Sequence, residues 1–141
     1  MAQQESKEIV RRSYQVISEG VRSGDFSGLD EVVARDVRDH NPDPGQEQGL
    51  EGVRGLFMGL RDAFPDLQIH VEDLIAEGDK VVGRATFRGT HSGDFQGIPA
   101  TGKQIEVQVI DILRIQDGKI VERWGLSDQL GLMQQLGAMP A

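Results

Sequence analysis

The spacing of apolar residues along this 141-residue chain changes at Leu67, and this change constrains the fold more than any other feature. Ahead of it, apolar residues recur every three or four positions, which is typical of amphipathic helices. From Leu67 onward they recur at every second position, which is typical of strands with one buried face. A block of helices followed by a block of strands favours an α+β fold over a parallel α/β sheet.

Three helices are expected ahead of that change, and the residues that end them can be identified. Gly24 ends the first helix and Pro65 ends the third, because glycine and proline interrupt helical hydrogen bonding. Between the second and third, Pro42 and Pro44 indicate a loop that follows a few extended residues up to His40. The expected helices cover residues 5–25, 26–36 and 50–66.

Four long strands are expected after the change, followed by a short last helix over residues 127–137. The pair Asp117 and Gly118 lies between two alternating runs, which is a strong signal for a tight hairpin turn. The pattern therefore predicts one α+β domain over residues 1–141, with the N-terminal helices packed over a curved antiparallel sheet. The expected strands cover residues 67–76, 80–90, 104–115 and 119–128.

Composition excludes several classes of function. The chain has no cysteine, and its three histidines are far apart in sequence, so we expect no metal site. It has no phosphate-binding or dinucleotide-binding glycine motif, so we expect no cofactor. A net charge of -8 with scattered basic residues argues against nucleic acid as a partner. No apolar run is long enough for a membrane span and no secretion signal is recognisable, so we expect a cytoplasmic protein.

The predicted hairpin around Asp117 and Gly118 carries two acids, Asp111 and Asp128, that are candidates for chemistry. With a two-residue turn, Asp111 would lie opposite Trp124 and Val107 opposite Asp128, so that one face carries both carboxylates among apolar and aromatic side chains. If that face lines a pocket, desolvation raises the pKa of a carboxylate there. An aspartate can then serve as a general acid or base near neutral pH.

Both acids also have a structural interpretation, and the residues alone leave the choice open. Asp128 stands where the N-cap of the last helix is expected. Asp111 has Arg114 and Arg123 within reach as partners on the surface of the sheet.

Three further polar side chains are candidates for the same pocket. His40 precedes Asn-Pro, and His91 stands at the entrance of a long loop; either imidazole could donate or accept a proton. Tyr14 has a hydroxyl that could reach a cavity from the first helix. The structural alternatives are a loop histidine bonded to backbone and a core tyrosine with a satisfied hydroxyl.

Several segments, taken in order, match a known pattern. They are DHNP at 39–42, AFPDLQIHVEDLIAEGDKVV at 63–82, GTHSGDFQGIPATGK at 89–103, and DILRIQDGKIVERWGLSDQLGLMQQLG at 111–137. Together they resemble the SnoaL-like polyketide cyclase family of the nuclear transport factor 2-like superfamily, over nearly the whole chain. The resemblance implies a cone-shaped α+β barrel whose curved sheet wraps around a deep cavity. It also implies a homo-oligomer, either a dimer or a tetramer.

The resemblance implies a reaction as well. Characterised cyclases of that family close a ring by intramolecular aldol condensation without metal or cofactor, using an aspartate after the tryptophan strand as general acid and base. The matching residue is Asp128. Arg114 falls where those cyclases place a histidine, which is a departure from the family's pattern.

The expected function is cofactor-free acid/base chemistry on a small hydrophobic carbonyl compound. Asp128 would remove a proton next to a carbonyl, and His40, His91 or Tyr14 would stabilise the enolate oxygen by hydrogen bonding. Other functions stay open. An epoxide hydrolase would use Asp111 and Asp128 with Arg114 and would need the two acids to converge on one water. An isomerase could use the same cavity, and a dimer could bind a small molecule without reacting. The residues expected to contact substrate are Tyr14, Phe57, Asp111, Arg114, Trp124 and Leu126.

Overall fold

The computed structural model describes residues 2–138, and the predicted α+β architecture is confirmed. None of the helices in that range is long and apolar enough to cross a membrane. In chain order the elements are α1 Ala2–Ser23, α2 Leu29–Val32, β1 Val33–Asp39, α3 Gly49–Ala63, β2 Gln68–Glu77, β3 Lys80–Thr90, β4 Gln104–Gln116, β5 Lys119–Ser127 and α4 Gln129–Leu136.

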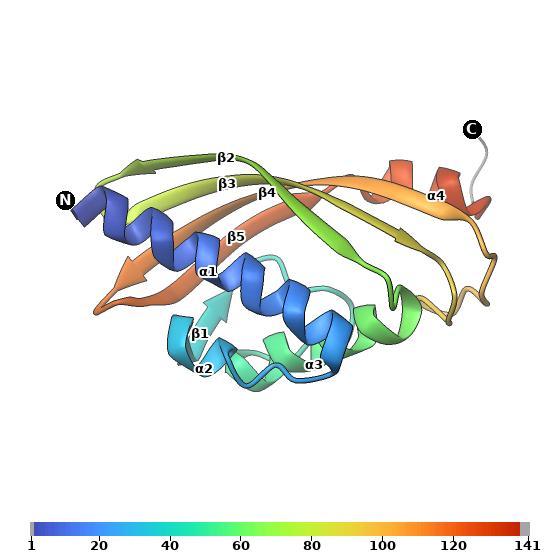
Figure 1. Cartoon of the computed structure of the whole chain (residues 1–141), viewed down its shortest axis with the longest axis horizontal. Helices are drawn as coiled ribbons and strands as arrows, with labels where there is room; N and C mark the ends of the chain where they lie inside the picture. The colour runs from blue at the N-terminus through green and yellow to red at the C-terminus, as the bar shows by residue number, and fades with distance from the viewer. Residues whose placement is uncertain (1, 139–141) are drawn as a thin grey trace.

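The strands form one sheet in the order β1-β5-β4-β3-β2. Strands β2 to β5 are antiparallel neighbours, which confirms the predicted antiparallel sheet. Figure 1 shows them as long, curved ribbons that arch over α1, α2 and α3, all of which lie on one side of the sheet. The sheet is therefore curved around the helices but is not closed into a barrel.

The second predicted helix is too long. Only Leu29–Val32 is helical, and Gly28 at its N-cap provides no side-chain hydrogen bond. From Val33 the chain is extended and pairs in parallel with β5, which places β1 at the edge of the sheet. The β-branched valines of this segment suit a strand, and the pairing with β5 supplies the backbone hydrogen bonds that a helix would have made.

The predicted register of β4 and β5 is wrong by one residue over most of its length. A bulge close to the hairpin turn shifts the pairing, so that Asp111 lies opposite Gly125 instead of Trp124. Because side chains alternate between faces, a shift of one residue moves each side chain of β5 to the other face. Trp124 and Leu126 therefore point away from the helices, and Arg123 joins Asp111 on the face that the helices cover.

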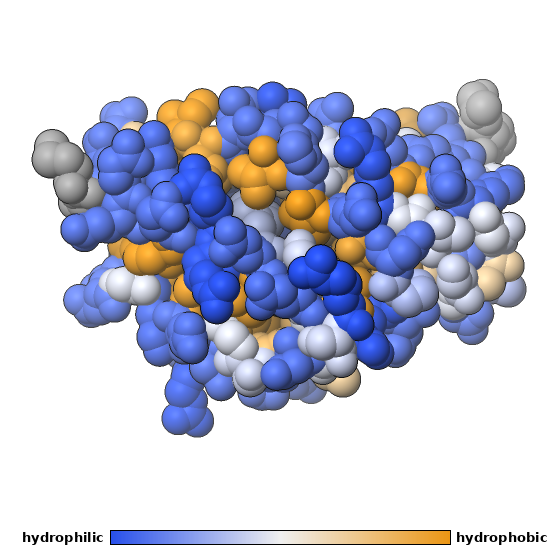
Figure 2. Space-filling model, in the orientation of Figure 1, coloured by the Kyte–Doolittle hydropathy of each residue, from blue (hydrophilic) through white to orange (hydrophobic). Residues whose placement is uncertain are grey.

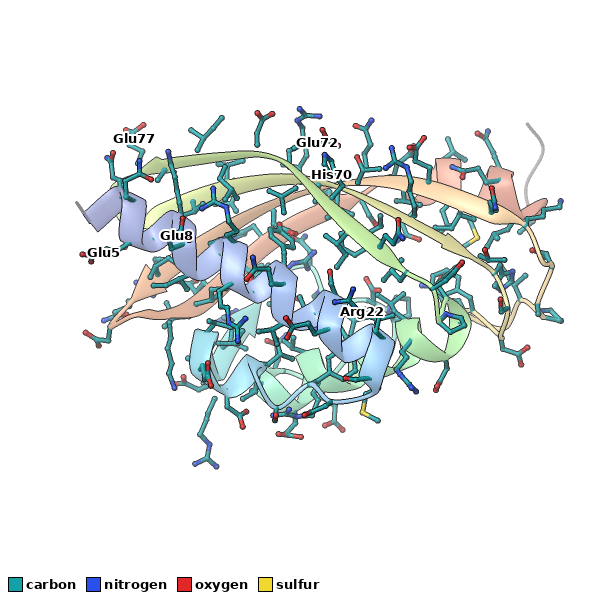
Figure 3. The ribbon with its side chains drawn as sticks, viewed as in Figure 1. Glu5, Glu8, Arg22, His70, Glu72 and Glu77 are labelled. Atoms are coloured by element: carbon teal, nitrogen blue, oxygen red, sulfur yellow. The ribbon has the colours of Figure 1, made fainter. Side chains whose placement is uncertain are left out.

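The core lies between the concave face of the sheet and the helices. Val10 and Val21 of α1, Phe64 after α3, and Val81 and Ala85 of β3 are among its most deeply buried members. The side chains on the opposite face of β2 are solvated: Figure 3 shows His70 and Glu72 on the side of the sheet away from the helices. The surface seen in Figure 2 is largely hydrophilic, with hydrophobic side chains visible in gaps between the polar ones.

Candidate active site

A cavity of about 170 Å³ lies between the concave face of the sheet and the helices α1 and α3. Most of its wall is apolar, with Phe57 and Leu60 of α3 facing Val107 and Val109 of β4. Its charged lining residues are few, and they come from β1, β4, β5 and the loop after β1. They are Asp39, Asp43, Asp111 and Arg123.

Tyr14 joins the first helix to this polar group. Its side chain is only 5% exposed, and its hydroxyl donates a hydrogen bond to Asp111 Oδ2 at 2.9 Å. Gly83 on β3 makes room for it, because a Cβ at that position would come within 2.7 Å of the hydroxyl oxygen. Burial raises the pKa of Tyr14, and the charge and hydrogen bond of Asp111 raise it further. The phenol therefore stays protonated and acts as a donor.

Arg123 connects two buried carboxylates. Its Nη2 lies 2.9 Å from Asp111 Oδ1, and its Nη1 lies 3.1 Å from both carboxylate oxygens of Asp39. Gly125 is necessary for this arrangement, because a side chain there would overlap both Asp111 Oδ1 and the guanidinium. Burial opposes the charge of Arg123, but the two aspartates outweigh burial and raise its pKa. The guanidinium is thus a fixed positive charge at the polar end of the cavity.

The loop after β1 holds Asp39 in place through two glutamines. Gln46 Nε2 donates to Asp39 Oδ2 at 3.0 Å, and Gln48 bonds both the backbone N–H and the backbone carbonyl of Asp39. The backbone N–H of Asn41 donates to the other carboxylate oxygen of Asp39 at 3.0 Å. Asp39 is therefore fully engaged, and its role is to position Arg123.

Asp43 differs from the other two aspartates of the cavity. Its backbone N–H donates to Gln46 Oε1 at 3.0 Å, so the loop fixes its position. Its carboxylate makes no hydrogen bond or ion pair with any other residue in the range 2–138. Burial raises the pKa of Asp43; Arg123 lowers it in part, and the nearby charge of Asp39 raises it.

The predicted burial of Asp128 is wrong. Its side chain is exposed, lies outside the cavity lining, and accepts a hydrogen bond from the backbone N–H of Gly131 at 2.8 Å. Asp128 is thus the N-cap of α4, which is the structural interpretation that the sequence left open. The shift in register is the reason, because it gives the inner face to Arg123 and Gly125.

His40, Arg114, Trp124 and Leu126 also lie outside the cavity lining. His40 stacks on Trp124 with ring centroids 4.6 Å apart, and its Nε2 lies 2.8 Å from Glu122 Oε2. Arg114 Nε donates to the other oxygen of Glu122 at 2.6 Å. The hydrogen bonds from His40 and Arg114 lower the pKa of Glu122. These residues form a polar and aromatic cluster on the outer face of the sheet, not a substrate pocket.

His91 is fully buried, and its side chain holds together the two ends of the loop that it begins. Its Nδ1 accepts a hydrogen bond from the backbone N–H of Thr101 at 3.2 Å and lies 3.0 Å from the Thr101 hydroxyl. Its ring packs on Phe64 with centroids 5.5 Å apart. The imidazole is not part of the cavity lining, so it ties the two ends of the loop together instead of facing substrate.

The structure brings together Tyr14, Phe57 and Asp111 among the predicted site residues. It adds Asp39 and Asp43, which the sequence pattern does not reveal because acids near Pro42 and Pro44 are typical of solvated loops. The sequence predicts Arg123 only as a surface partner of Asp111. The pairing is correct, but it is formed inside the cavity.

The chemistry open to this site is that of carboxylates, a phenol and a guanidinium. Among residues 2–138, no three histidine, aspartate or glutamate side chains are placed so that they could share a metal ion. An apolar cavity with one polar end can bind a small hydrophobic compound and orient a carbonyl group toward donors and acceptors.

Comparison with known proteins agrees with this geometry. A family model described as SnoaL-like polyketide cyclase matches residues 9–136. The chain is 31% identical over 134 residues to the aklanonic acid methyl ester cyclase DauD of Streptomyces sp. (strain C5), covering 92% of this chain and 80% of that protein. It is 34% identical over 101 residues to the aklanonic acid methyl ester cyclase DnrD of Streptomyces peucetius, covering 70% of this chain and 67% of that protein.

A solved structure shares this fold. The structure of TsrD from Streptomyces laurentii superposes with a TM-score of 0.83 at 36% identity, covering 94% of this chain and 97% of that one. The expectation of an enzyme of the cyclase type is confirmed by the named cyclases and by the family model. Because that model spans nearly the whole chain, the protein belongs to the SnoaL-like polyketide cyclase family.

Proposed function

We propose that this protein catalyses a cofactor-free intramolecular ring closure, an aldol condensation or a related reaction, on a small hydrophobic carbonyl compound. One observation carries the proposal: Asp111 is a buried carboxylate at the polar end of a largely apolar cavity, held by Tyr14 and Arg123. The relatives named as aklanonic acid methyl ester cyclases support a polyketide ester as the class of substrate.

The proposed reaction starts with proton removal. Asp111 Oδ2 accepts one hydrogen bond, from Tyr14, so this oxygen keeps a lone pair with which to take a proton next to a substrate carbonyl. The positive charge of Arg123 lies beside the same carboxylate and favours negative charge on the enolate oxygen. The enolate carbon then attacks a second carbonyl, and the apolar wall keeps the two carbons close.

The experiment that tests this proposal is direct. The wild-type protein is incubated with an aromatic polyketide methyl ester that carries two side-chain carbonyls, and the ring-closed product is followed by chromatography and NMR. Asp111→Asn keeps the shape of the side chain but removes its basicity, so we expect kcat to fall about 100-fold. Asp111→Asn with unchanged turnover would contradict the role of this carboxylate, and a wild type without any ring closure would contradict the function.

The epoxide hydrolase alternative required Asp111 and Asp128 to converge on one water. Asp111 lines the cavity, whereas Asp128 is exposed and caps α4, so that convergence does not occur. The binding-only alternative predicts tight binding of the polyketide ester without product, and the same incubation distinguishes it.

We also propose that the protein forms a homodimer through the outer face of the sheet. Ile110 lies opposite Leu126 on adjacent strands, and Ile112 lies opposite Trp124, so these side chains form one continuous patch. Leu126 is 73% exposed and Ile110 is 51% exposed, which is unusual for large apolar side chains on neighbouring strands. A second copy related by a twofold axis would present the same patch and cover it.

A further inference from the structure

We infer that Asp43 is a second catalytic residue of this site, the acid that protonates the alkoxide formed when the ring closes. The inference rests on the proposed function and assigns different roles to two carboxyl groups. Asp111 would act as the base and Asp43 as the acid.

The position of Asp43 gives it access to both substrate and water. It lines the cavity, and it also borders an open groove between its own loop, α3 and residues 94–96. Gln46, Leu56 and Leu60 also line both the cavity and the groove, so the two spaces share part of their wall beside Asp43. A carboxyl group at this junction can transfer a proton inward and recover one from solvent.

The carboxylates of the three aspartates in the cavity differ in their partners, and this difference indicates different roles. Asp39 and Asp111 are both ion-paired with Arg123, whereas the Asp43 carboxylate has no such partner among residues 2–138. Gln46 holds the Asp43 backbone and the Asp39 side chain at the same time, so Asp43 is fixed relative to the ion-paired group. Its carboxyl is positioned by the loop but is left available to a ligand.

The charges around Asp43 favour its protonated form. Asp39 faces it from β1, and Arg123 from β5 is the single basic residue among the described residues that line the cavity. Glu47 and Glu51 at the start of α3, together with Asp94 across the groove, add further negative charge on the solvent side. Burial raises the pKa of Asp43, Arg123 lowers it in part, and Asp39 raises it. Two carboxyls of one cavity thus sit in different environments, one ion-paired and one without a partner, as acid and base pairs require.

The proton balance of the reaction closes with these two groups. Asp111 takes the proton from the substrate carbon, and the electron pair left behind forms the new carbon–carbon bond. The carbonyl under attack becomes an alkoxide, which takes the proton of Asp43. After the product leaves, Asp111 releases its proton to water that enters the cavity, and Asp43 regains a proton from water in the groove. The product is therefore an isomer of the substrate, and no other reactant is consumed.

The first test compares Asp43→Asn with Asp36→Asn, an exposed aspartate of β1 that serves as a control for the loss of one carboxylate. We expect Asp43→Asn to lower kcat about 100-fold with little change in KM, and Asp36→Asn to behave as wild type. In the wild type, kcat should fall as the pH rises and Asp43 loses its proton. This alkaline decline should be absent from Asp43→Asn. Asp43→Asn with wild-type kcat and pH profile would overturn the inference, while loss of turnover in Asp111→Asn alone would leave the proposed function intact.

The second test needs no substrate. The side-chain carboxyl carbon of Asp43 is titrated by NMR, with Asp43→Asn used to assign its signal. We expect a midpoint above the ordinary value of about 4, and a lower midpoint in Asp39→Asn because one repelling charge is removed. A midpoint at or below the ordinary value would overturn the inference even if the wild type closes the ring.

Discussion

Arg123 of β5 and Asp111 of β4 lie on neighbouring strands and both line the cavity, with Nη2 and Oδ1 2.9 Å apart. Asp39 of β1 forms the second ion pair of the guanidinium. This ion pair links the edge strand to the centre of the sheet and defines the polar end of the cavity. Different substitutions test the contribution of this ion pair to the free energy of unfolding and the contribution of the site to turnover.

Arg123→Met should destabilise the fold strongly. It leaves the carboxylates of Asp39 and Asp111 buried without their cation, and breaking a buried pair in this way costs about 3 to 5 kcal/mol in the free energy of unfolding. Denaturant unfolding monitored by circular dichroism measures the loss. Arg88→Met is the control, because Arg88 pairs with Glu106 on the exposed face and should cost less than about 1 kcal/mol. Equal losses in both variants would argue against a buried ion pair.

Tyr14→Phe should reduce turnover through Asp111. The substitution removes the hydroxyl that donates to Asp111 Oδ2 and leaves the ring in the core, so the free energy of unfolding should fall by about 1 to 3 kcal/mol. If the hydroxyl acts by holding Asp111, Tyr14→Phe and Asp111→Asn together should lose little more activity than Asp111→Asn alone. Steady-state kinetics of both single variants and the double variant give the coupling. Additive losses would mean that Tyr14 acts independently.

Gly125→Ala should break the site while keeping the strand. The new methyl group would overlap Asp111 Oδ1 and the Arg123 guanidinium, so these two side chains would have to separate. We expect a lower free energy of unfolding and a loss of ring closure. Gly55→Ala on α3 is the matched control, since nothing lies within 4 Å of a Cβ there, and it should add up to about 1 kcal/mol of stability through helix propensity. An active, fully stable Gly125→Ala protein would contradict the close packing at this position.

Asp128→Ala should lower stability without lowering kcat. Removing the N-cap of α4 costs about 1 kcal/mol, and Asp128→Ser should recover most of it because serine is also a good N-cap. Thermal unfolding and ring-closure kinetics are measured on both variants. A large fall in kcat for Asp128→Ser, with stability retained, would return the catalytic role to this residue.

Leu126→Glu should yield a monomer if the outer face of the sheet is the dimer interface. The substitution places a charge opposite Ile110 in the middle of the apolar patch. Light scattering coupled to gel filtration measures the molar mass. Met58→Glu is the control, because Met58 is an exposed apolar residue of α3, away from the outer face of the sheet. A wild type that runs as a monomer would refute the proposed dimer.

Much of the fold follows from local pattern. Apolar residues three or four apart predict α1 and its buried face, which carries Val10, Tyr14, Ile17 and Val21. The alternation on both sides of Asp117 and Gly118 predicts the hairpin of β4 and β5. The N-cap role of Asp128 was likewise available from the sequence of the last helix. In each case the determining interactions span a few residues, so neighbouring residues in the sequence carry the signal.

The site itself depends on which face of β4 and β5 is buried, and the pattern could not decide this. Val109 on the inner face of β4 and Ile110 on the outer face are both apolar, so hydrophobicity fits either assignment. The bulge beside the turn shifts the pairing of β5 by one residue, so each of its side chains points to the opposite face from that expected without a bulge. This shift places Arg123 next to Asp111.

The sequence by itself therefore determined α1, α3 and α4, the four antiparallel strands, the turn between β4 and β5, and the family to which the chain belongs. It did not reveal β1, which was expected to be part of a helix. Only the tertiary structure decided that Asp39 and Asp43 lie in the cavity while Asp128 lies outside it. The physical reason is the separation in sequence of the residues that interact. A helix or a hairpin is stabilised by contacts between residues close in sequence, whereas a charge is buried only with partners that can lie far along the chain. The ion pair of Arg123 with Asp39 is an example.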